Sequence, residues 1–100
     1  MPDDSPLTPE QLSPALAGLP GWTASGGYLQ KTFKCRDFPA AIALISAVVE
    51  DCEAINHHPE VSNVYRKTTF ALTTHSAGNQ ITGKDIDLAQ RIEARADAFA

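Results

Sequence analysis

A chain of 100 residues, 43% hydrophobic and 20% charged, has the size and composition of one folded domain rather than of a disordered segment. The net charge of −4 and the absence of a long basic run exclude a surface that follows nucleic-acid phosphates. The longest apolar stretch, residues 38–49, is too short for a membrane span and no secretory leader is visible, so we expect a cytoplasmic protein with reduced Cys35 and Cys52.

The first twenty positions are rich in proline. Residues 1–6 combine two prolines and two aspartates without an apolar pattern, which predicts a loose terminus. Thr8 then matches a helix N-cap, and Gln11 stands where it completes a capping box. Pro14 limits this helix, which we expect to end before residue 20.

Two strands are predicted next. Residues 22–25 and 28–34 flank Gly26 and Gly27, which supply the positive φ angles of a two-residue hairpin turn. The order of the runs predicts an antiparallel hairpin.

A long helix begins at the N-cap Asp37 and ends by about residue 57, because Pro59 moves the residue before it out of the helical region. Its apolar residues form one face with a second apolar strip beside it. The face consists of Phe38, Ile42, Ile45, Val49 and Cys52, and the strip of Ala41, Leu44, Ala47 and Val48. Two interpretations remain open: this wide surface meets another subunit, or the helix is deeply buried.

Alternating and β-branched residues predict strands over 61–66 and 68–74, with a turn at Arg66 and Lys67. A loop follows over 76–80, and Thr82 and Asp85 form the capping box of a last helix. The order of elements predicts a single α+β domain over residues 1–100, a four-stranded antiparallel sheet with about three helices packed on one face.

Three histidines stand at the ends of predicted elements, where sites are commonly built. His57, His58 and His75 suit proton transfer in both directions near neutral pH, although isolated surface histidines are also common. Glu53 lies one helical turn before His57 and is expected to orient it, with a solvated pair as the alternative. Asp85 is expected to cap the last helix and to reach the same site.

A zinc site is a second chemistry that these residues allow, because three histidines and a water are a known catalytic ligand set. Adjacent His57 and His58 would need local bending of the backbone to share one metal. Cys52 lies on the apolar face of its helix and is expected in the core rather than as a nucleophile.

Four short segments together resemble the pterin-4a-carbinolamine dehydratase family. They are Glu53–Pro59, Asn63–Tyr65, the pair Thr74 and His75, and Asp85–Ala89. Their spacing is similar to that family's signature, and weaker likenesses extend over nearly the whole chain. Two positions differ: Val61 and Ser62 replace two aromatic residues that relatives often carry, and the segment after His75 differs from that of animal members.

The resemblance implies a hydro-lyase that removes water from 4a-hydroxytetrahydrobiopterin to give quinonoid dihydropterin, with no metal and no organic cofactor. It implies catalysis by His58 and His75, with His57 binding the pterin and sharing the acid role. The substrate-binding set that it implies is Glu53, His57, His58, Pro59, Thr74, His75, Ser76, Ala77 and Asp85.

The resemblance also implies partners. They are the pterin substrate, further copies of the chain in a homodimer or homotetramer, and a functional link to an aromatic amino acid hydroxylase. Because animal relatives also serve as dimerisation partners of a transcription factor, a non-catalytic binding module is the alternative function.

Overall fold

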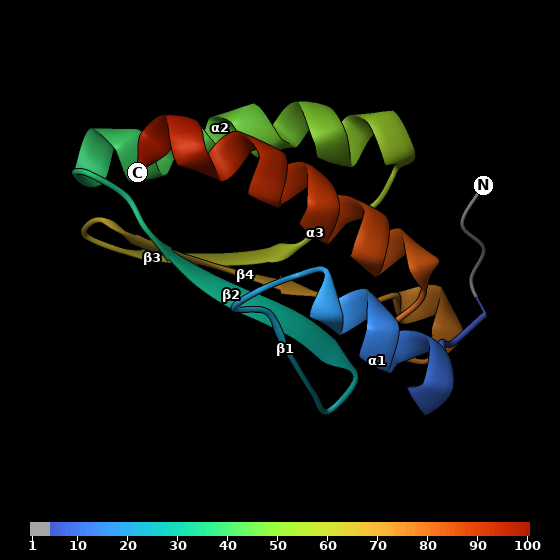
Figure 1. The fold of residues 1–100 in the computed structure, drawn as a ribbon. Helices are drawn as coiled ribbons and strands as arrows, with labels where there is room; N and C mark the ends of the chain where they lie inside the picture. Colours follow the sequence, from blue (N-terminus) through green and yellow to red (C-terminus); the bar gives the residue numbers. More distant parts are fainter. Residues whose placement is uncertain (1–4) are drawn as a thin grey trace.

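The computed structural model describes residues 5–100 and shows an α+β fold, as predicted (Figure 1). Its main elements are α1 (Pro9–Ala17), β1 (Thr23–Ser25), β2 (Tyr28–Lys34), α2 (Phe38–Ile55), β3 (Glu60–Val64), β4 (Lys67–Leu72) and α3 (Gly83–Ala96). Short 3-10 turns span His75–Ala77 and Asp97–Phe99. Within the described residues, no helix has the length and apolar character needed to cross a membrane.

The four strands form one antiparallel sheet in the order β1-β2-β4-β3. Figure 1 shows α2 and α3 side by side over one face of this sheet, with α1 next to the end that carries the β1–β2 hairpin. Every second residue of the two central strands points into the layer between sheet and helices, where burial of apolar side chains stabilises the fold. The largest fully buried side chains in this layer come from the central strands and from the facing sides of α2 and α3: Phe70, Leu29, Leu44, Leu72, Leu88 and Ile92.

The sequence signals for helix starts are confirmed. Thr8 and Gln11 form the expected capping box, and Asp37 accepts a hydrogen bond from the backbone N–H of Ala40 at 2.8 Å. Pro14 does not limit the first helix as predicted: it lies inside α1, which continues to Ala17. In a short helix on the surface, the chain tolerates the one backbone hydrogen bond that proline removes.

Two predictions about loops are wrong. The turn between β3 and β4 is formed by Tyr65 and Arg66, because Lys67 already pairs with Val64. The Thr68 hydroxyl donates to the Asn63 side chain at 2.6 Å, which helps to fix this register.

The prediction of a loose N-terminal segment is wrong at its last residue. Pro6, which the sequence placed in a loose terminus, forms a β-bridge with Thr82, and the Leu7 N–H donates to the Ile81 carbonyl at 2.9 Å. The rest of that prediction, for residues 1–4, lies outside the described residues.

The predicted glycine turn is confirmed, with φ angles of 60° at Gly26 and 83° at Gly27. The two positions have different surroundings. A Cβ atom at Gly27 would lie 2.0 Å from the Asn79 carbonyl oxygen, whereas one at Gly26 would have no heavy atom within 4 Å. The turn of the hairpin therefore packs directly against the loop that follows β4.

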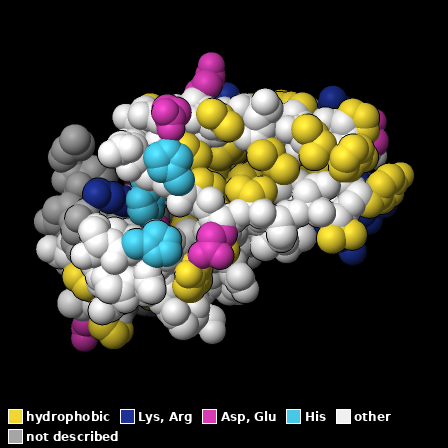
Figure 2. Space-filling model, turned by 180° about the vertical axis from the view of Figure 1, so that it is seen from behind, with side chains coloured by type: hydrophobic (Ala, Val, Ile, Leu, Met, Phe, Trp, Pro, Cys, Tyr) yellow, Lys and Arg dark blue, Asp and Glu magenta, His cyan; other side chains and the backbone are white. Residues whose placement is uncertain are grey.

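Helix α2 is buried on one side only. Leu44 and Val48, from the second apolar strip of the sequence, face the sheet and are 0% and 2% exposed. Phe38, Ile42 and Val49, from the apolar face beside that strip, are about half exposed, and Val61 of β3 is 40% exposed. We call these last four residues the α2–β3 patch; Figure 2 shows hydrophobic side chains gathered on this side of the molecule.

Candidate active site

The three histidines gather at one end of the molecule, where α2 ends and β4 runs into the loop before α3 (Figure 2). They line a hollow of about 320 Å³, within the size range of small-molecule sites. Its lining residues are Asn56, His57, His58, Thr73, Thr74, His75, Ser76 and Lys84. The structure therefore brings together residues that are up to 28 positions apart.

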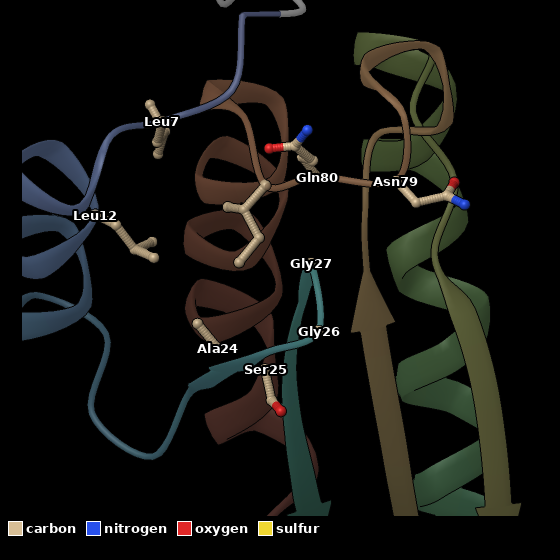
Figure 3. Close-up of a pocket in the computed structure, with 9 residues that line it drawn as sticks. Leu7, Leu12, Ala24, Ser25, Gly26, Gly27, Asn79 and Gln80 are labelled. Atoms are coloured by element: carbon tan, nitrogen blue, oxygen red, sulfur yellow. The ribbon is translucent and has the colours of Figure 1, made fainter.

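A larger groove of about 530 Å³ lies between α1 and the β1–β2 turn (Figure 3). Its lining residues are Leu7, Leu12, Ala24, Ser25, Gly26, Gly27, Asn79, Gln80 and Ile81. None of these nine carries an ionisable side chain, so acid–base chemistry belongs to the smaller histidine hollow.

His57 reaches the hollow because α2 ends two residues before it. Asn56 adopts the left-handed conformation at φ 50° and caps the helix, a position that asparagine tolerates well. The ring of His57 then turns inward, and Nε2 lies 2.6 Å from Oδ1 of Asp85. His57 is buried, and Asp85 is fully buried.

Asp85 stands at the centre of a buried hydrogen-bond network. Its Oδ2 accepts from the Thr74 hydroxyl at 2.8 Å and from the Thr82 backbone N–H at 2.9 Å, which completes the predicted capping box. An ionised carboxylate only accepts hydrogen bonds, so Nε2 of His57 carries the proton in this contact. Because the Thr74 hydroxyl donates to Asp85, the Thr82 hydroxyl donates to Thr74.

The predicted pairing of Glu53 with His57 is wrong. Oε2 of Glu53 instead lies 2.7 Å from Nε2 of His58. The reason is the left-handed turn at Asn56, which removes His57 from the helical spacing and brings His58 near Glu53. This pair is exposed, with 58% of the His58 side chain accessible, so its contribution to stability is small.

His75 opens the 3-10 turn after β4, and its Nδ1 lies 2.6 Å from Oδ1 of Asn79. Asn79 was not among the predicted site residues, because a histidine followed four residues later by an asparagine in a loop is a weak signal. Asn56, Thr73 and Lys84, which line the hollow, were not predicted either.

Two of the implied substrate-binding residues, Thr74 and Ala77, already use their backbone N–H groups within the loop. The Thr74 N–H donates to the Gln80 carbonyl at 3.0 Å, and the Ala77 N–H donates to the Thr74 carbonyl at 3.1 Å. Pro59 lies outside the histidine hollow, in an adjoining apolar groove that also includes Glu53 and His58.

Cys52 is buried in the core, as predicted. Burial raises the pKa of its thiol and also that of Cys35, so neither is an activated nucleophile. Among residues 5–100, no three His, Cys, Asp or Glu side chains are arranged to hold a metal ion.

Comparison with known proteins identifies relatives. The family model for pterin 4 alpha carbinolamine dehydratase matches residues 5–95. Curated relatives that share this dehydratase name include one from Nocardia farcinica, 48% identical over 87 residues, which are 87% of this chain and 90% of the relative. One from Mycobacterium tuberculosis is 43% identical over 88 residues, covering 88% and 93%.

A solved structure agrees with these relatives. The crystal structure of "transcriptional coactivator/pterin dehydratase" from Brucella melitensis matches with a TM-score of 0.86 and 32% identity, covering 92% of this chain and 99% of that chain. The matching fold and the family model together define a small α+β enzyme of the hydro-lyase class. The chain belongs to the pterin-4-alpha-carbinolamine dehydratase family.

Proposed function

We propose that this protein removes water from 4a-hydroxytetrahydrobiopterin to give quinonoid dihydropterin, and so supports tetrahydrobiopterin recycling. The observation that carries the proposal is the convergence of His57, His58 and His75 on one hollow. Family membership supports the dehydratase reaction.

The elimination needs two proton transfers. An acid protonates the 4a hydroxyl group so that it leaves as water, and a base removes a proton from the neighbouring ring nitrogen. The electron pair of that N–H bond forms the new double bond to the carbon that loses water. Imidazole groups suit both steps near pH 7.

Each histidine receives a role in this proposal. His58 and His75 exchange the protons, while His57 binds the pterin and shares the acid role. The fixed contact between His57 and Asp85 supports a binding role, because it holds the ring in one orientation. Of the implied binding set, His57, His58, Thr74, His75 and Ser76 line the hollow and would contact the pterin, while the buried Asp85 would act through His57.

The proposal is tested by generating the unstable substrate in situ with an aromatic amino acid hydroxylase. Absorbance of the quinonoid product is followed with and without this protein between pH 6 and 8. We expect clear acceleration over the uncatalysed reaction and none from heat-denatured protein. Equal rates with and without the native protein across this range would contradict the proposal.

We also propose that further copies of the chain, in a homodimer or homotetramer, cover the α2–β3 patch. Its four half-exposed apolar side chains support this, because such clusters on small proteins mark contact surfaces. Light scattering after size-exclusion chromatography measures the mass in solution. A mass equal to the single chain of 10.7 kDa would contradict this assembly.

A binding module is the second candidate function, favoured by the same patch and by the coactivator description of the Brucella structure. It predicts a protein that lacks dehydratase activity, since a scaffold does not need the three histidines. The activity measurement therefore separates the two functions. A functional link to a hydroxylase follows only from the first, since the hydroxylase supplies the substrate.

A further inference from the structure

The three histidines of the hollow have different partners. His57 and His58 each contact a carboxylate, Asp85 and Glu53, whereas His75 contacts the neutral side-chain amide of Asn79. Asn79 does not line the histidine hollow. It belongs to the opposite groove, and Figure 3 shows its side chain turned away from Leu7 and Leu12. Asn79 therefore contacts His75 from outside the site.

The backbone of Asn79 is held in place from within its own loop. Its φ angle is 60°, in the left-handed region where asparagine is one of the few tolerated residues. Its N–H donates to the Thr74 carbonyl at 3.1 Å, and the Thr74 N–H donates to the Gln80 carbonyl at 3.0 Å. The two ends of the loop that carries His75 are thus joined by backbone hydrogen bonds.

The β1–β2 turn supports the same loop from the other side. The Asn79 carbonyl lies so close to Gly27 that a Cβ atom there would be 2.0 Å away. The Thr73 hydroxyl donates to the Gly27 carbonyl at 2.7 Å. The position of Asn79 is therefore set by contacts on both sides, which makes its side chain a fixed partner for the ring.

The direction of the hydrogen bond decides which nitrogen of His75 is available. Oδ1 of Asn79 is a carbonyl oxygen and only accepts, so Nδ1 of His75 carries the proton. In a neutral ring, Nε2 then has the free lone pair. When Nε2 takes up a proton, the Nδ1 hydrogen bond is retained, so the ring does not have to reorient during the transfer.

We infer that Asn79 is a positioning residue that holds His75 in its Nδ1–H tautomer, so that Nε2 acts as the proton acceptor in the dehydration. The inference rests on the proposed function for its catalytic part. It divides the histidines by partner: the ring bound to the neutral amide acts as the base.

Two variants separate the side chain from the backbone. Asn79→Gly removes the amide but keeps the left-handed backbone without strain. Asn79→Asp keeps an oxygen that accepts from Nδ1 and also tolerates this conformation. Gln80→Ala is the matched control, because this neighbouring exposed side chain lies in the same loop and lines the opposite groove rather than the histidine hollow.

The readouts are nitrogen NMR of the histidine rings and steady-state kinetics. Spectra are recorded at alkaline pH, and the signals of His75 are assigned by their loss in His75→Ala. We expect a protonated Nδ1 in wild type, Asn79→Asp and Gln80→Ala, and a mixture of both tautomers in Asn79→Gly. The kcat of Asn79→Gly should fall about 10- to 100-fold with little change in KM, because misplacement of a catalytic group can cost about 100-fold.

Several outcomes overturn the inference. A protonated Nε2 in wild type, or an unchanged tautomer in Asn79→Gly, shows that Asn79 does not set the tautomer. Mixed tautomers with wild-type kcat in Asn79→Gly overturn its catalytic part. If the wild-type protein shows the Nδ1–H signature but no dehydratase activity, the proposed function fails while the tautomer assignment is supported.

Discussion

Replacement of His75 by alanine is expected to lower dehydratase turnover about 10²- to 10⁴-fold, the usual contribution of a positioned acid or base. The ring is the proposed base, and alanine offers no group that can take its place. The side chain is exposed and its hydrogen-bond partner Asn79 lies in a surface loop, so its removal leaves no buried polar group without a partner. The loss should therefore appear in kcat without a comparable loss of stability.

The measurement is the coupled hydroxylase assay together with thermal unfolding of each variant. Gln30→Ala serves as the control, because this exposed side chain lies on the open face of the sheet, opposite the helices. Its turnover should equal that of wild type. If His75→Ala keeps more than about one tenth of wild-type turnover, the loss is smaller than a positioned base would cause, and the assigned role of His75 is wrong.

Replacement of Asp85 by alanine is expected to destabilise the fold by several kcal/mol, because each buried donor that loses its acceptor costs about 1–3 kcal/mol. Three donors lose their acceptor in the interior: the ring of His57, the hydroxyl of Thr74 and the backbone N–H of Thr82. Helix α3 also loses half of its capping box. For a domain of this size, such a loss is a large part of the free energy of unfolding.

Urea unfolding measures this effect through the shift of the midpoint. Asp87→Ala is a matched control, since it removes a carboxylate two residues further along α3 that pairs with Arg91 near the surface. The control should shift the midpoint only slightly, because pairs near the solvent contribute little. Equal shifts for the two variants would show that the buried network is not what makes Asp85 important.

Local signals predicted the helix starts and the glycine turn well. The caps Thr8, Asp37 and Thr82 act within three residues of their own position, so the sequence contains the whole interaction. Which side of α2 is buried could not be predicted from local signals. Whether Leu44 or Val49 faces the sheet depends on contacts with β4 and α3, and an apolar pattern that covers two sides of the helix does not decide between them.

In the candidate site too, local sequence signals were predicted correctly and contacts that depend on the path of the chain were not. The motif located the three histidines and Asp85, but it assigned Glu53 to the wrong ring, because one left-handed residue, Asn56, redirected the chain. The contact of His75 with Asn79 depends on the shape of a loop, and no periodic pattern reports such a shape.

The two adjacent glycines of the hairpin turn differ in the substitutions that they tolerate. Asparagine or aspartate can replace Gly26 at small cost, because its surroundings are open. The same replacement at Gly27 would displace the Asn79 carbonyl, and with it the loop that carries His75. A substitution at position 27 therefore requires a simultaneous change in the length or shape of residues 73–80, so we expect the two segments to change together in evolution.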